Sequence, residues 1–312
     1  MISILDVAAK AGVSKSSVSR YFNGGSISSS AKEKIKAAVE ELGYRPNAIG
    51  NMLRNNSTQN IALCVPTLVH PFFSAFVSEV NLALTKEGYR LIIGETEGKK
   101  GGESAFVKMV ENNEVDGLIL VAHHSIKHLN TSIPVVTIDR HFEGAPCITS
   151  DNYASTHLAL SYLYEKGARN IAFFGGKPAV ESEVSLRHQC YLDFLKEKGL
   201  QEYSCYEDIP HGEEFPLVSR YASLHPEIEA VFASSDAFAL SAYLAFGEKK
   251  RPIISFDGVL GSSVPTPKFT SIRQNIEGLG QAAVEELMKR LRGEPFEPIT
   301  YVSTTFEKGE TA

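Results

Sequence analysis

Residues 5–14 read LDVAAKAGVS, and residues 15–23 continue KSSVSRYFN. Apolar residues recur here at helical spacing, so the pattern predicts two short helices that share one small core. Gly12 lies where the chain must leave the first helix, because glycine accepts the positive φ of a helix end. Ser14 can then cap the second helix by accepting a hydrogen bond from a free backbone amide. Two short helices joined by a tight turn are typical of a helix-turn-helix that reads the DNA major groove.

A third helix is predicted directly after this pair. Ser30 and Glu33 fit a capping box at its start, and Gly43 ends it. Three helices in about 43 residues make a core that is marginal alone but adequate beside a larger domain. The residues expected in this core are Val7, Ala8, Ala11, Val18, Phe22, Ile35, Val39 and Leu42.

Charge is distributed unevenly along the chain. Residues 1–58 carry eight Lys and Arg against four Asp and Glu, a net charge of +4, and the remainder carries 23 against 33, a net charge of −10. A basic N-terminal part suits contact with phosphates, and an acidic remainder suits solubility. The alternative is an ordinary solvated helix face, since lysines such as those at 32, 34 and 36 are common on any helix.

Three ordered stretches resemble the lactose-repressor-type (LacI/GalR) family of bacterial transcription regulators. They are Asp6–Ser14, then Val18–Arg20 with Asn23, and Leu42–Ala48. The resemblance extends through the whole chain. It implies a DNA-binding domain over residues 1–57 and an effector-binding and dimerisation domain over residues 58–312.

The resemblance also implies which side chains contact DNA. Lys15 and Ser16 occupy positions at which the family varies its base-reading residues, and Arg20 occupies a common base contact. Arginine can donate two hydrogen bonds to guanine O6 and N7, a pair worth about 1–3 kcal/mol of discrimination. The residues placed as phosphate contacts, which orient the domain without reading sequence, are Ser14, Ser19 and Asn23. The full implied set is Ser14, Lys15, Ser16, Ser19, Arg20, Asn23, Asn47 and Leu53.

Residues 46–54 resemble the family's hinge helix, which forms on DNA, pairs with its dimer mate and wedges a leucine into the minor groove. Pro46 suits the first turn of a helix, and Leu53 matches the wedging leucine by its spacing from Pro46. Gly50 stands where the family generally has alanine and costs about 1 kcal/mol in a helix interior. We therefore expect a weaker hinge helix in the absence of DNA. The alternative is that Leu53 only packs on the rest of the protein.

Beyond the hinge, short apolar runs alternate with amphipathic helices. Strands are predicted over 61–66, 90–94, 117–121, 134–139, 170–175, 230–233 and 252–257, and helices over 72–87, 103–112, 154–166, 186–198 and 237–246. Repeated βαβ units imply an α/β fold with parallel sheets and helices on both faces. The family resemblance makes this a two-lobed, periplasmic-binding-protein-like domain. Lobe 1 is expected over about 59–149 and 275–297, and lobe 2 over about 150–274 and 298–312.

The same resemblance implies an effector site in the cleft between the lobes, beyond the carboxyl ends of the strands. Arg187 matches the family's effector-binding arginine, and Asp257 matches its acidic partner. Such a pair can hold vicinal hydroxyls while an aromatic ring covers the apolar face of the ligand. The alternatives are a core role for the Phe pair and a surface ion pair for Arg187. The full expected set is Phe72, Phe73, Arg187, Phe215, Ser235, Asp236 and Asp257.

The sequence motifs do not support an enzymatic function. The chain contains no GxSxG, GxxxxGK[ST] or HExxH pattern. His124 and His128 could bind a metal if they lie on a helix, but no carboxylate or cysteine nearby completes the set, so a loop or cleft-lining role is favoured. No catalytic residue, metal or cofactor is therefore expected.

The compartment follows from the cysteines and the apolar runs. Cys64, Cys147, Cys190 and Cys205 show no CxxC spacing and are typical of reduced core thiols. The N-terminus is not a signal peptide and no apolar run reaches membrane length, so a cytoplasmic protein is expected rather than an exported sugar-binding protein. The predicted function is a homodimeric repressor that binds a palindromic operator and responds to a sugar or sugar phosphate. A purine- or phosphocarrier-responsive regulator remains the alternative, and a sugar-binding protein or a sugar-converting enzyme is less favoured.

Overall fold

The structure is a computed structural model that describes residues 2–22, 24–44, 57–96, 101–121, 126, 129–210, 212–247, 251–260 and 267–312. Within it the chain forms two compact units, Met1–Thr58 and Gln59–Ala312. Each unit is described by itself.

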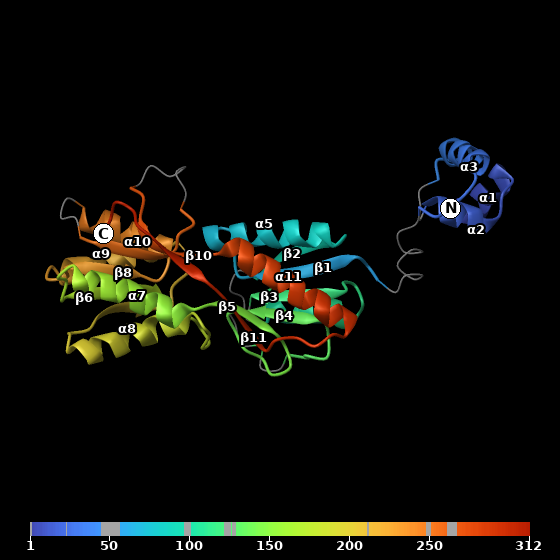
Figure 1. Ribbon diagram of the computed structural model, residues 1–312. Helices are drawn as coiled ribbons and strands as arrows, with labels where there is room; N and C mark the ends of the chain where they lie inside the picture. The colour runs from blue at the N-terminus through green and yellow to red at the C-terminus, as the bar shows by residue number, and fades with distance from the viewer. Residues whose placement is uncertain are drawn as a thin grey trace. The chain divides into compact units, whose positions relative to one another are not determined.

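The first unit contains the helices α1 (Ile4–Ala11), α2 (Lys15–Phe22) and α3 (Ser29–Leu42) (Figure 1). Gly12 and Gly43 end α1 and α3 with φ of 61° and 58°, as their positions in the sequence predict. The shared core is confirmed, with Ala38 added to the predicted set. Its buried members are Val7, Ala8, Ala11, Val18, Ile35 and Ala38, and its partly buried members include Phe22, Val39 and Leu42.

The predicted start of α3 is wrong by two residues. The helix begins at Ser29, and Ser28 caps it by accepting a hydrogen bond from the Ala31 amide at 3.3 Å. Ser30 is already inside the helix, so it cannot form the expected capping box with Glu33. Three consecutive serines at 28–30 offered the same chemistry, and the backbone selected the first of them.

The second unit has two lobes, each built on a parallel sheet. Lobe 1 contains β1 (Asn60–Val65), β2 (Arg90–Glu95), β3 (Gly117–Val121), β4 (Val135–Ile138), β5 (Cys147–Ser150) and β11 (Ile299–Val302). Among the described residues these form a six-stranded sheet in the order β11-β5-β4-β3-β1-β2. Helices α5 (Pro71–Lys86) and α11 (Ile276–Arg292) cover one face, and α6 (Gly102–Glu111) covers the other. Every strand and helix predicted in lobe 1 is confirmed, and no end is shifted by more than one residue.

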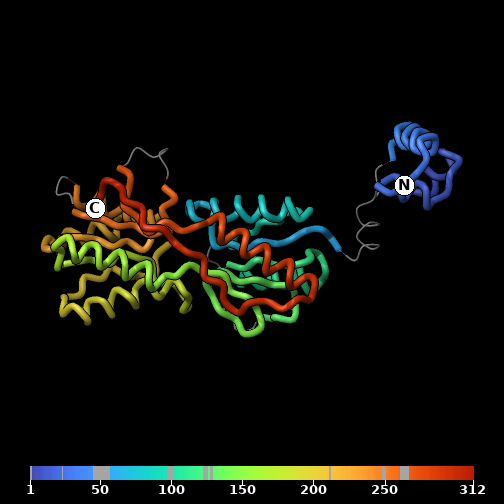
Figure 2. Tube along the Cα trace, in the orientation of Figure 1, coloured from blue at the N-terminus to red at the C-terminus, as the bar shows by residue number. Residues whose placement is uncertain are grey.

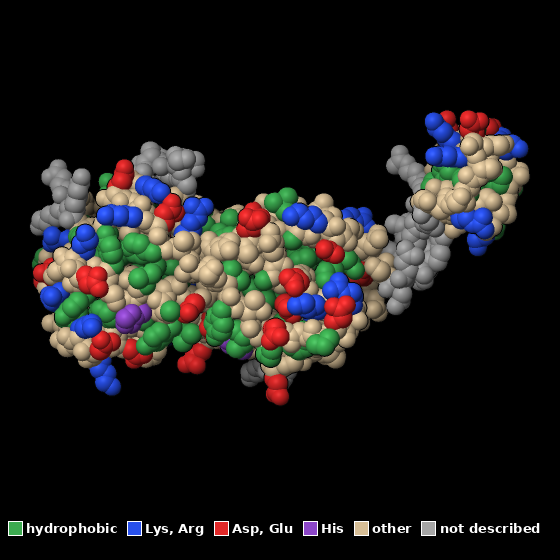
Figure 3. Space-filling model, viewed as in Figure 1, with side chains coloured by type: hydrophobic (Ala, Val, Ile, Leu, Met, Phe, Trp, Pro, Cys, Tyr) green, Lys and Arg blue, Asp and Glu red, His purple; other side chains and the backbone are tan. Residues whose placement is uncertain are grey.

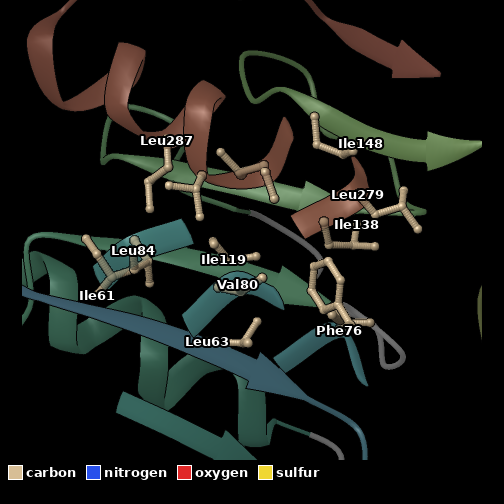
Figure 4. Packing of buried hydrophobic residues seen from close by; sticks show 14 of the residues in the cluster. Ile61, Leu63, Phe76, Val80, Leu84, Ile119, Ile138, Ile148, Leu279 and Leu287 are labelled. Atoms are coloured by element: carbon tan, nitrogen blue, oxygen red, sulfur yellow. The ribbon is translucent and has the colours of Figure 1, made fainter. Parts of the chain in front are cut away.

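The core of lobe 1 lies between the sheet and the helix pair α5–α11. Figure 4 shows Phe76, Val80 and Leu84 of α5 with Leu279 and Leu287 of α11 against the strands. Side chains of β1, β3, β4 and β5 complete the cluster. Those strand residues are Ile61, Leu63, Ile119, Ile138 and Ile148.

Lobe 2 repeats this design. Its strands are β6 (Ile171–Gly176), β7 (Tyr203–Glu207), β8 (Ala230–Ala233), β9 (Ile253–Asp257), β10 (Thr270–Gln274) and β12 (Thr304–Glu307). In the described part of the chain they form a sheet in the order β12-β10-β9-β8-β6-β7, parallel except for β12. Helices α7 (Asn152–Glu165) and α8 (Ser185–Lys198) pack on one face, and α9 (Glu214–Leu224) and α10 (Asp236–Phe246) pack on the other.

The chain passes between the lobes after β5, after β10 and after β11 (Figure 2). The expected last crossing at residue 298 is wrong, because β11 pairs in parallel with β5 and so belongs to lobe 1. On this last crossing the chain therefore returns to lobe 2 only after Val302. Figure 3 shows acidic and basic side chains interspersed over the viewed face of this unit, as on an ordinary solvated surface. None of the described helices has both the length and the apolar character needed to span a bilayer.

Candidate functional site

Helix α2 presents the predicted DNA-contacting side chains. Lys15, Ser16 and Arg20 are exposed and Ser19 is partly exposed, while Val18 points into the core. Lys15 with Ser19, and Ser16 with Arg20, are spaced four residues apart and so lie on one side of the helix. The structure therefore brings four predicted contacts to one surface. Asn23, Asn47 and Leu53 lie outside the described residues, as do His123, His124 and His128.

The start of α2 is fixed by a serine cluster. The Ser17 amide donates to Ser14 Oγ at 3.2 Å, so the predicted cap is confirmed. Ser14 Oγ also lies 2.7 Å from Ser16 Oγ and 2.9 Å from Ser17 Oγ. These local hydrogen bonds orient the exposed N-terminal turn of α2 before any ligand is present.

In the second unit, Arg187 is the centre of a buried polar cluster. It lies in the first turn of α8 with only 5% of its surface exposed. Its Nε donates to Asn152 Oδ1 and its Nη1 to the Ser234 carbonyl, both at 2.7 Å. Its Nη1 is also 3.6 Å from Asp257 Oδ1, and its guanidinium carbon lies 3.6 Å from the centroid of the Phe256 ring. The alternative of a surface ion pair for Arg187 is thereby excluded.

Asp257 links Arg187 to the segments of the chain that cross between the lobes. It is the last residue of β9 and has a φ of 91°, a conformation that non-glycine residues adopt only under tertiary constraint. Its Oδ1 accepts a hydrogen bond from Gln274 Nε2 at 2.7 Å, and Gln274 Oε1 accepts one from Ser150 Oγ at 2.8 Å. Because Ser150 ends β5 and Gln274 ends β10, the network ties together two of the inter-lobe crossings.

Lobe 1 contributes a carboxylate that sequence reasoning did not assign to the site. Asp139 follows β4, has a φ of 57° and accepts a hydrogen bond from Thr149 Oγ1 at 2.6 Å. Asn152 Nδ2 donates to Thr149 Oγ1 at 3.3 Å and to the Ser150 carbonyl at 2.9 Å. The signal for Asp139 was available, since it stands at the carboxyl end of a predicted strand. We refer to Asp139, Thr149, Ser150, Asn152, Arg187, Asp257 and Gln274 as the buried polar cluster.

The charges of this cluster perturb one another. Loss of water around the carboxylates raises the pKa of Asp139 and of Asp257, and the nearby Arg187 opposes the shift in both. Burial lowers the pKa of Arg187, and Asp257 and Asp139 oppose that shift. The guanidinium and the two carboxylates therefore stabilise each other's charged forms.

Backbone and side-chain contacts join the lobes next to the cluster. The Glu183 amide, in the loop before α8, donates to the Asp139 carbonyl at 2.8 Å. The side chain of Glu183 also pairs with Nε2 of His141, which belongs to lobe 1. The loop that leads into Arg187 is thus held against lobe 1.

The predicted aromatic pair divides between two roles. Phe72 is buried in the lobe 1 core and stacks on Phe76 with ring centroids 6.3 Å apart, which is the core alternative that the sequence left open. Phe73 remains partly exposed beside His70 at the start of α5. An effector contact by either ring stays a prediction, and the packing favours Phe73.

Asp236 already has partners of its own. Its Oδ2 accepts from the Val259 amide at 2.6 Å and the Leu260 amide at 2.9 Å, and its Oδ1 lies 3.4 Å from the Gly258 amide. This carboxylate fixes the loop that follows Asp257, so it acts on the cluster by positioning. Its contact with an effector stays a prediction.

Two further predicted residues stay at the margin of the site. Ser235 is partly exposed at the start of α10. Phe215 is 44% exposed in the first turn of α9, which follows β7 at the edge of the lobe 2 sheet. Neither contributes to the hydrogen bonds of the cluster described above. Across the described ranges, no three His, Cys, Asp or Glu side chains are grouped as a metal site requires.

Two family models match the chain. The model for bacterial regulatory proteins of the lacI family matches residues 3–47, and the model for periplasmic binding proteins and the sugar-binding domain of the LacI family matches residues 58–295. The first covers α1, α2 and α3, and the second covers the buried polar cluster.

Similar proteins match almost the whole length of the chain. The ribose operon repressor of Halalkalibacterium halodurans is 29% identical over 96% of this chain and 94% of its own. The sucrose operon repressor of Lactococcus lactis subsp. lactis is 30% identical over 96% of each chain. A solved structure of the transcriptional regulator CelR in complex with cellobiose is 25% identical, covers 100% of both chains and has a TM-score of 0.71.

Proposed function

The chain belongs to the LacI family of bacterial regulatory proteins, not to an enzyme family, and on that premise we propose that it represses a carbohydrate-utilisation operon under the control of a sugar. Residues 1–57 would bind operator DNA, and residues 58–312 would bind the effector and form a homodimer. Two DNA-binding domains related by a two-fold axis match a palindromic operator. Because its target is DNA, we place the protein in the cytoplasm.

The observation that carries this proposal is the buried polar cluster. It gathers charged side chains from both lobes at the carboxyl ends of β4 and β9, where ligands bind in open α/β sheets. A ligand held there contacts both lobes at once, so its binding energy depends on how the lobes are closed. The effector then changes DNA affinity by its different affinity for the two arrangements.

The operator side is tested by selecting DNA from a random pool with the full-length protein. We expect a palindromic consensus whose two halves bind one dimer. Fluorescence anisotropy with that operator then measures the dissociation constant with and without sugars. A consensus without two-fold symmetry contradicts the homodimeric reading, and a dissociation constant that no effector changes contradicts ligand control.

A further inference from the structure

Glu183 of lobe 2 contacts lobe 1 at a point away from the segments where the chain crosses between the lobes. It lies in the loop between β6 and α8, its amide donates to the Asp139 carbonyl at 2.8 Å, and its side chain pairs with His141. The crossings after β5, β10 and β11 connect the lobes covalently, whatever the angle between them. The two contacts of Glu183 can exist only while lobe 1 lies against this loop. We call the arrangement seen in the structure the closed arrangement.

Both ends of this loop are anchored to lobe 2. At its start the Lys177 amide donates to the Glu207 carbonyl of β7 at 2.8 Å. At its end the Leu186 amide, in the first turn of α8, donates to the Glu183 carbonyl at 3.1 Å. Glu183 therefore moves with lobe 2, and a rotation of α8 away from lobe 1 must break both of its contacts with lobe 1.

The side chain of Glu183 loses most of its water in the closed arrangement. It is 11% exposed, whereas His141 keeps 41% of its side chain exposed. Oε1 of Glu183 pairs with His141, but Oε2 is buried and accepts no hydrogen bond within the described part of the chain. A buried acceptor without a partner costs free energy of the same order as the gain from one hydrogen bond.

The carboxylate of Asp139 opposes the closed arrangement as well. Burial raises the pKa of Asp139, and the negative charge of Glu183 raises it further. The two carboxylates therefore repel each other across the boundary between the lobes. Attractive and repulsive contacts meet at Glu183, so a small change at this residue should shift the balance between closed and open lobes.

We propose that His141 and Glu183 form a clasp that holds the lobes closed without a ligand, and that the half-paired carboxylate of Glu183 lets the clasp open readily. The clasp goes beyond the proposed function, because it does not depend on which ligand the protein binds. Its two members have unequal roles. His141 offsets the cost of burying the carboxylate, whereas Glu183 both joins the lobes and opposes their closure. A ligand that prefers one arrangement then acts on an equilibrium that is already close to balance.

Distances between two spin labels test the clasp in the full-length protein without a ligand. Lys108→Cys on α6 of lobe 1 and Lys196→Cys on α8 of lobe 2 provide exposed sites for the labels, and all four native cysteines are buried. An excess of unlabelled chains ensures that each distance measured by pulsed electron paramagnetic resonance lies within one chain. We expect the distance of the closed arrangement to predominate, with the open arrangement as a minor second distance. A protein that lacks the closed distance overturns the proposal.

His141→Ala should open the lobes. The Glu183 carboxylate would then be buried in the closed arrangement without its side-chain partner, so the closed-to-open ratio should fall about tenfold. Adding Glu183→Ala removes the buried carboxylate, so the double variant should be more closed than His141→Ala alone. An unchanged ratio in His141→Ala overturns the proposal. A double variant at least as open as His141→Ala also overturns it, because the carboxylate would then not oppose closure.

A second histidine pair provides the matched control. His225 pairs with Glu227, with Nδ1 and Oε1 3.1 Å apart, but both residues lie in lobe 2. His225→Ala should therefore leave the distances between the lobes unchanged, and His141→Gln, whose amide can still donate to Glu183, should recover most of the closed population. An equal shift in His225→Ala would mean that loss of any histidine–carboxylate pair loosens the protein, and would overturn the assignment of the clasp to His141.

Discussion

Helix α2 and the buried polar cluster differ in the exposure of their polar side chains and in the range of their hydrogen bonds. The α2 side chains predicted to contact DNA are exposed or partly exposed, and the hydrogen bonds at the start of α2 connect residues no more than three positions apart. All members of the cluster except the partly exposed Asp139 are buried, and the hydrogen bonds of the cluster connect residues from both lobes that are up to 124 positions apart. The first arrangement leaves side chains free to meet a ligand without supporting the fold. The second makes recognition and folding depend on the same atoms.

Removal of Arg187 should therefore have the largest effect. Truncating one member of a buried ion pair costs about 3–5 kcal/mol of stability, because the remaining charge has no partner. Arg187→Met should lower the free energy of unfolding by about this amount, measured with urea. It should also lower the affinity for the effector by more than about 100-fold. Combining it with Asp257→Asn should recover much of the stability without restoring the effector response. Recovery of both would mean that Arg187 does not contact the effector.

The stability of the Arg187→Met variant should depend on pH, because Arg187 influences the pKa of Asp139 and of Asp257. Burial already raises the pKa of Asp139 and Asp257, and Arg187 is what opposes that rise. Without Arg187 the pKa of both carboxyls rises further in the folded protein. A raised carboxyl pKa means that stability is lost as pH rises through the folded value and regained as pH falls toward the unfolded value. The stability deficit of the variant should shrink between pH 7 and pH 5, and a constant deficit would contradict the coupling.

Arg20→Ala should affect recognition alone. Loss of a bidentate contact to guanine costs about 1–3 kcal/mol, so operator affinity should fall about 10- to 100-fold while binding to random DNA changes little. The melting temperature should not change, because Arg20 is exposed and its side chain supports no packing in the core of the first unit. Lys36→Ala, an exposed cation on α3, is the matched control for charge. Equal losses on operator and random DNA would assign Arg20 to the phosphates.

Ser14→Ala should have a smaller effect that combines both kinds of role. Loss of a helix cap costs about 1 kcal/mol, and here it would release the amide of Ser17 at the start of α2. We expect operator affinity to fall about fivefold, measured by anisotropy. Ser14→Asn supplies another good cap and should restore most of the affinity. If asparagine fails to rescue, Ser14 acts through the phosphate contact rather than through the cap.

The same contrast explains what the sequence could predict. The three helices of the first unit could be predicted from the sequence, because their apolar residues recur at helical spacing and these residues form the core. Arg187 and Asp257 were implied by the family resemblance, and the structure places their side chains 3.6 Å apart in the buried polar cluster. The sequence analysis did not assign Asp139 or Gln274 to the site. Asp139 stands at the carboxyl end of a predicted strand, but local spacing does not say which strand ends meet in space, and the strand that ends at Gln274 was not predicted. β10 escaped prediction for a related reason: its sequence TSIRQ contains one aliphatic residue, and burial between β9 and β12 makes it a strand.

His188 provides the smallest and most discriminating test, since it adjoins Arg187 in sequence but points elsewhere. Its ring stacks on Tyr206 with centroids 4.0 Å apart, and its Nε2 lies 2.8 Å from Ser204 Oγ. Burial, aided by Lys177, lowers the pKa of His188, so protons bind the unfolded chain more readily. Stability should therefore fall as pH drops below about 6.5, and His188→Gln should flatten this part of the profile. The effector response should be unchanged. A changed response would show that the contacts of His188 affect Arg187. The buried polar cluster would then not be independent of the residues that surround it.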